Sequence, residues 1–80
     1  MQFLIVRAKK YGSDELLKES IPVFIDGTEN GETNNPIKLD AGTIDVSLQD
    51  EHSEIRTVTV KNTTQEKPME VIIEVGEEDI

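Results

Sequence analysis

The segment from Asp26 to Gly31 has the spacing of oxygen-bearing side chains that comes nearest to an ion site. Its order, Asp-Gly-Thr-Glu-Asn-Gly, places oxygen ligands at the first, third and fifth positions and a glycine at the sixth, as an EF-hand calcium loop does. The bidentate carboxylate that must end such a loop is replaced by Ile37, and the flanking segments predict strands where helices are needed. An EF-hand is therefore excluded. Two alternatives stay open, a looser oxygen site made by Asp26, Glu29, Asn30 or Glu32, or a plain Gly-rich hairpin loop.

His52 is the second residue with chemical potential, because it lies among the carboxylates of residues 50–54. A transition-metal site needs further His or Cys ligands, and the chain has one His and no Cys. A single His in a polar hairpin tip is typical of a solvated side chain. No Ser or Thr lies in a recognisable nucleophile motif. We therefore predict that the chain is not an enzyme and holds no catalytic residue, cofactor or metal.

Strands dominate the elements that would position these residues, because apolar residues recur with period two. Residues 43–49 alternate Ile44, Val46 and Leu48 with polar side chains, as a strand with one buried and one wet face requires. Residues 69–75 repeat the pattern. Four further strands are predicted over residues 3–8, 21–26, 37–39 and 55–61.

The segments between these strands are short and rich in turn residues, which favours pairing between neighbours. Residues 13–19 are the exception. There Ser13 can cap a short helical turn, or the segment can be a linker with a minor boundary near residue 20. We predict one domain over residues 1–80, with an N-terminal strand and connector (1–20), a sandwich core (21–75) and an acidic tail (76–80).

Composition limits the classes of partner. The 80 residues include 17 acidic and 8 basic side chains, a formal net charge of −9, which repels phosphate backbones and anionic lipid head groups. We therefore expect no nucleic acid partner and no membrane insertion. No signal peptide or membrane-spanning segment is visible, so we expect a cytoplasmic protein if these residues are the full chain.

Residues 21–48 resemble a PEGA domain, a small β-sandwich module of bacterial and archaeal surface and multidomain proteins. The likeness rests on a strand that ends in Asp-Gly (residues 21–27), a Gly-x-Thr and Pro turn that enters the next strand (31–39), and a Gly-led strand (41–46). The chain departs from that pattern where Asn34 and Asn35 separate the Thr from the Pro. The resemblance implies an accessory module with no catalytic residues.

Together these observations predict an all-β fold, a small antiparallel Ig-like or PEGA-like β-sandwich of about six strands. The predicted function is a non-catalytic structural or protein-interaction module, which contacts a protein partner through a sheet edge or the loop of residues 27–35. The candidate interaction residues are Asp26, Glu29, Asn30, Glu32 and Asn34. A carbohydrate- or calcium-binding accessory module is the alternative. Aromatic residues make up 4% of the chain, and Tyr11 is the one plausible sugar platform. The oligomeric state is left open.

Overall fold

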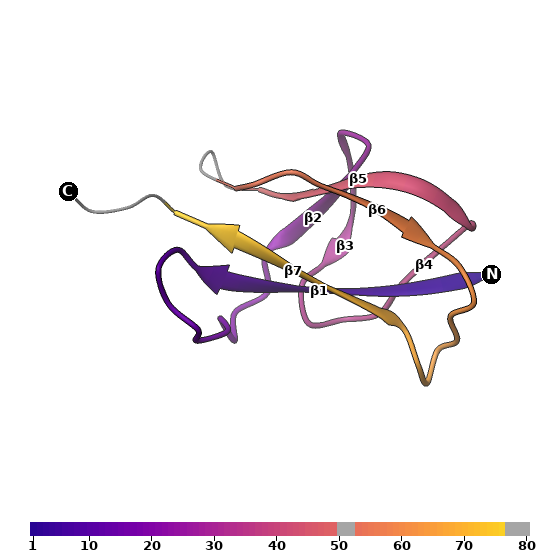
Figure 1. The fold of residues 1–80 in the computed structure, drawn as a ribbon, viewed down its shortest axis with the longest axis horizontal. Helices are drawn as coiled ribbons and strands as arrows, with labels where there is room; N and C mark the ends of the chain where they lie inside the picture. The colour runs from indigo at the N-terminus through magenta and orange to yellow at the C-terminus, as the bar shows by residue number, and fades with distance from the viewer. Residues whose placement is uncertain (50–52, 77–80) are drawn as a thin grey trace.

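The fold was analysed in a computed structural model, which describes residues 1–49 and 53–76. These residues form seven strands and no helix, so the all-β prediction is confirmed (Figure 1). No helix long and apolar enough to cross a membrane occurs in them. In chain order the strands are β1 (Gln2–Lys10), β2 (Pro22–Ile25), β3 (Thr28–Glu32), β4 (Ile37–Leu39), β5 (Gly42–Leu48), β6 (Arg56–Val60) and β7 (Met69–Val75).

The strands form two sheets, one of three strands in the order β4-β1-β7 and one of four in the order β3-β2-β5-β6. Four of the five strand pairs are antiparallel, as expected for this sandwich. The pair of β1 and β7 is parallel, in register from Leu4 opposite Met69 to Lys10 opposite Val75. Parallel neighbours need a long crossover between them. Here the rest of the domain is that crossover, since β1 and β7 are the first and last strands.

The core lies between the sheets and is made of inward-facing β-strand residues. Ile44, Val46 and Leu48 share one face of β5, as the alternation predicts, and the last two are buried. Each fully buried side chain of this size stabilises the fold by about 1.5–3 kcal/mol. The buried apolar residues are Leu4, Val6, Ala8, Val23, Ile37, Val46, Leu48, Val60, Val71, Ile73 and Val75.

Strand β3 corrects the expectation that residues 27–35 form a loop. All five of its residues are exposed and none is apolar apart from Gly31, so no hydrophobic alternation indicates a strand. It forms because Asp26 and Gly27 both adopt positive φ, 52° and 83°, the conformation of a two-residue hairpin turn that pairs Thr28 with Ile25. Backbone pairing at a sheet edge needs no apolar side chain.

Of the two alternatives for residues 13–19, the helical turn does not form. The connector after β1 turns back along that strand, where Leu16 forms an antiparallel bridge with Lys9 and the Leu17 amide donates to the Ala8 carbonyl at 2.8 Å. Strand β4 pairs with β1 only as far as Leu4. The connector thus bonds backbone groups of β1 that β4 is too short to reach. A helical turn in the connector would leave these groups of β1 without partners, which is unfavourable.

Candidate functional site

The five candidate residues lie on or beside the β2–β3 hairpin, and the structure places them in different roles. His52 and the acidic tail beyond Gly76 lie outside the described residues. Asp26 lies in the turn between β2 and β3 and is bonded to β5: its Oδ1 accepts the Asp45 amide at 2.9 Å, and its own amide donates to the Asp45 carbonyl. The Thr57 hydroxyl donates in turn to the Asp45 carboxylate at 2.6 Å. The Asp26 carboxylate therefore anchors the hairpin turn to β5.

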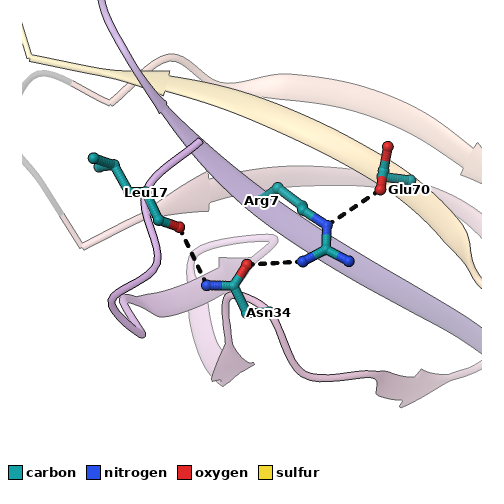
Figure 2. Close-up of polar contacts among 4 residues, drawn as sticks. All are labelled: Arg7, Leu17, Asn34 and Glu70. Atoms are coloured by element: carbon teal, nitrogen blue, oxygen red, sulfur yellow. Dashed lines mark hydrogen bonds and ion pairs between the residues drawn. The ribbon is translucent and has the colours of Figure 1, made fainter. Parts of the chain in front are cut away.

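Asn34 ties the connector to the three-stranded sheet (Figure 2). Its side-chain amide donates to the Leu17 carbonyl at 3.3 Å, and its Oδ1 accepts from the Arg7 guanidinium at 3.0 Å. Arg7 pairs with Glu70 at 3.2 Å. The Asn34 backbone has φ of 66°, a left-handed conformation that Asn tolerates better than most residues. The amide thus serves an internal network, a role that sequence reasoning did not foresee.

The other three candidates, Glu29, Asn30 and Glu32, are exposed on β3. Over residues 1–49 and 53–76, no three His, Cys, Asp or Glu side chains are grouped so that they can hold an ion.

The free edge of β3 is bulged and negatively charged. Pro22 has no amide hydrogen, and its carbonyl accepts the Gln49 amide on the β5 side. Pro22 and its β3 partner Glu32 are therefore a non-hydrogen-bonded pair, in which the backbone groups of Glu32 point away from the sheet. The same alternation turns the backbone of Glu29 outward. A register shift separates these two positions by three residues instead of two. A bulge combined with acidic side chains is typical of an edge protected against a further strand.

The free edge of β7 is capped. The Glu54 carboxylate accepts the Glu74 amide at 2.9 Å, and the Glu54 amide donates to the Glu74 carbonyl. The Arg56 guanidinium donates to the Ile72 carbonyl at 2.8 Å. At the other edge of the same sheet, strand β4 has only three residues. Shortening and capping both limit strand addition.

The free edge of β6 has none of these protections. The backbone groups of Asp45 point toward β2, because its carbonyl accepts the Asp26 amide. Since these groups alternate along an antiparallel strand, the backbone groups of Ile44 and Val46 point toward β6. Their partners on β6 are Val58 and Arg56. The backbone groups of Thr57 and Thr59 consequently point outward, away from β5. No hydrogen bond from another described residue reaches them.

The side chains along this edge are regular and β-branched. Residues 57–60 read Thr-Val-Thr-Val, with no proline, bulge or charge. Thr57 and Thr59 bond across to β5, the latter through a 3.0 Å contact with the Thr43 hydroxyl. Just before the strand, Ile55 is 71% exposed. This combination marks an edge open to pairing with another chain.

A shallow cavity of about 290 Å³ lies where β6 begins, beside β7. Its lining is Lys9, Glu54, Arg56, Ile72 and Glu74. The Lys9 ammonium pairs with the Glu74 carboxylate at 3.3 Å, and Glu54 and Arg56 bond the β7 backbone. The two positive and two negative groups balance, so the cavity offers no net charge for an ionic ligand.

Alternation within residues 55–61 predicted the strand but could not show that it lies at a sheet edge, because neighbours are set by tertiary structure. Comparisons with known proteins found no matching family model, no curated protein and no solved structure. The resemblance to a PEGA domain therefore stays a prediction.

Proposed function

We propose that this chain is a non-catalytic protein-interaction module that binds an extended segment of a partner by adding it to the free edge of β6. One observation carries the proposal. The outward backbone groups of Thr57 and Thr59 are open, whereas the edges of β3, β4 and β7 are bulged and charged, short, or capped.

Strand addition gives affinity through main-chain hydrogen bonds and specificity through alternate side chains. On the inner face of β6, Val58 is half-buried next to Ile44 and favours an apolar partner side chain. Ile55 offers a second apolar contact at the start of the strand. The outer face presents threonine hydroxyls. The edge is thus suited to a short β-strand with alternating apolar and polar residues.

The β2–β3 hairpin supports this function indirectly. Its acidic, bulged strand keeps the opposite edge of the same sheet from competing for the partner segment. Its turn fixes β2 to β5 through Asp26, and β5 in turn carries β6. The β2–β3 hairpin therefore protects the opposite sheet edge and holds β2 against β5, and it does not itself bind the partner.

The test is selection of displayed random heptapeptides on the immobilised protein, with two matched proline variants. Thr57→Pro removes one outward amide from β6, and Glu29→Pro removes one outward amide from β3, so neither loses a backbone hydrogen bond inside its sheet, although Thr57→Pro also loses the side-chain bond to Asp45. Selected peptides are expected to bind the wild type and Glu29→Pro alike, and to bind Thr57→Pro at least about tenfold more weakly. An amide NMR spectrum of each variant verifies the fold. Peptides that bind Thr57→Pro as well as the wild type would refute the proposal.

A further inference from the structure

The three central residues of β6 are symmetric about Val58, with Thr57 before it and Thr59 after it. We infer that the segment added to this edge is β6 of a second copy of the chain. The two copies pair antiparallel about a twofold axis at Val58, and their four-stranded sheets join into one continuous sheet. The inference rests on the proposed function, since it names the occupant of the same edge.

The backbone groups of the two copies match in this register. Thr57 of each copy lies opposite Thr59 of the other, and both positions point outward. In an antiparallel ladder, two such opposed residues exchange both N–H···O bonds. All the outward groups at positions 57 and 59 are therefore bonded in both copies. A twofold axis requires this kind of self-complementary patch.

The side chains match as well, face by face. On the outer face, Thr57 and Thr59 already continue rows that begin at Asp45 and Thr43, and pairing extends each row into the second copy. On the inner face, the half-buried Val58 meets Val58 of the second copy. Thr–Thr and β-branched pairs across strands are favourable, and polar positions meet only polar ones.

Charge permits pairing at β6 and opposes it at β3. In the β6 register Arg56 lies opposite Val60, and Ile55 lies opposite Lys61, whose aliphatic stem can cover it. Self-pairing of β3 instead opposes its two outward positions, Glu29 and Glu32, which repel one another. The second copy therefore has one edge at which it fits.

The net charge of −9 supplies a signature that separates a second copy from a basic partner. Two copies repel at long range, so added salt strengthens their association, whereas salt weakens the binding of a basic segment. Sedimentation equilibrium from about 10 µM to about 1 mM protein, in about 20 mM and about 500 mM NaCl, measures this directly. The wild type and Glu29→Pro are expected to dimerise, more strongly in high salt, and Thr57→Pro at least about tenfold more weakly.

The register has its own test because the chain contains no cysteine. Opposed residues of a non-hydrogen-bonded pair have Cα atoms about 4.5 Å apart, inside the range of about 4.4–6.8 Å that a disulfide bridges. Under mild oxidation, Val58→Cys is expected to form a covalent dimer at least about tenfold faster than the matched control Glu29→Cys. Adding Thr57→Pro to Val58→Cys should remove that advantage. Non-reducing electrophoresis follows the rates.

A wild type that stays monomeric at the highest concentration in both salts, with no excess rate for Val58→Cys, overturns self-pairing. The peptide selection then separates the two proposals. Peptide binding that depends on Thr57 leaves strand addition in place with a different protein as occupant. Peptide binding that is indifferent to Thr57 removes both proposals.

Discussion

At the scale of single residues, the fold depends on a few polar and small side chains that periodicity does not reveal. Thr33 is fully buried, and its hydroxyl accepts the Ile21 amide at 2.9 Å and donates to the Glu19 carbonyl at 3.2 Å. Together with Asn34 it holds the chain where it passes from one sheet to the other. These residues define the geometry of the connection between the sheets.

Gly31 has both a positive φ and a close neighbour, whereas Gly27 has a positive φ without a close neighbour. Comparing the two separates backbone strain from overpacking. Both have φ near 84°, but a Cβ at Gly31 would lie 2.7 Å from Cγ1 of Ile37, whereas one at Gly27 meets nothing within 4 Å. We expect Gly27→Ala to lower the free energy of unfolding by about 1–2 kcal/mol. Gly31→Ala should lower it by about 3 kcal/mol or more, because overpacking adds to the backbone strain. Urea unfolding of both variants checks this, and equal losses would contradict the role of Ile37.

Asn34→Asp keeps the shape of the side chain and the acceptor for Arg7 but removes the amide donor. A carboxylate oxygen then faces the Leu17 carbonyl, and also those of Lys18 and Glu19. We expect a loss of about 2 kcal/mol in the free energy of unfolding. Asn35→Asp is the control, since the Asn35 amide reaches only the nearby Thr33 carbonyl, at 3.5 Å. A similar loss in both variants would show that added charge, not the lost donor, is responsible.

At the scale of elements, the sheet edges decide how this domain meets other chains. Three of the four strand edges are protected in different ways, by a bulge and charge on β3, by brevity in β4, and by capping of β7. The cap on β7 comes from the segment that leads into β6. Protection of one edge and exposure of the next are thus produced by adjacent residues.

Removing the cap tests this arrangement. Glu54→Ala deprives the Glu74 amide of its carboxylate acceptor. Hydrogen exchange at Glu74 is expected to accelerate about tenfold, with a loss of roughly 1 kcal/mol in the free energy of unfolding. Glu70→Ala is the matched control on the same strand, because it removes only the exposed pair with Arg7, worth about 0–1 kcal/mol. Unchanged exchange at Glu74 in the Glu54 variant would mean that the carboxylate does not protect this edge.

At the scale of the whole molecule, net charge opposes the compact state. Nine net negative charges on 80 residues repel one another, and the ion pairs Arg7–Glu70 and Lys9–Glu74 are partly exposed. Salt therefore removes more repulsion than attraction. Stability should rise with ionic strength, in contrast to a protein held by surface ion pairs.

Thermal unfolding in about 20 mM and about 500 mM NaCl measures the effect, since the screening length falls from roughly 20 Å to roughly 4 Å. We expect stabilisation by about 1 kcal/mol, which raises the Tm by about 4–8 °C in a domain of this size. The Thr57→Pro background removes any contribution from association. Adding Glu29→Lys and Glu32→Lys changes the net charge from −9 to −5, because each exchange replaces a negative charge with a positive one, and should reduce the increase in Tm. A Tm that falls with salt would contradict charge repulsion.

The strands with strict alternation were predictable because burial of one face of a strand produces apolar residues at every second position of the sequence. Residues 69–75 match β7 in both bounds, and residues 43–49 match β5 to within one residue at each end. Strand β3 was missed because its five exposed residues show no such alternation. Of the candidate residues, Asp26 and Asn34 lie in internal hydrogen-bond networks, and nothing in their local sequence indicates those partners.

The sequence by itself thus determined the all-β class, the inward faces of the strongest strands and the excess of negative charge, since each follows from residue type and spacing along the chain. The tertiary structure alone decided which strands are neighbours. Alternation assigns a side chain to a face, but the hydrogen bonds that order a sheet come from backbone groups that are alike in every residue. The parallel pairing of β1 with β7 and the open edge of β6 are consequences of that order.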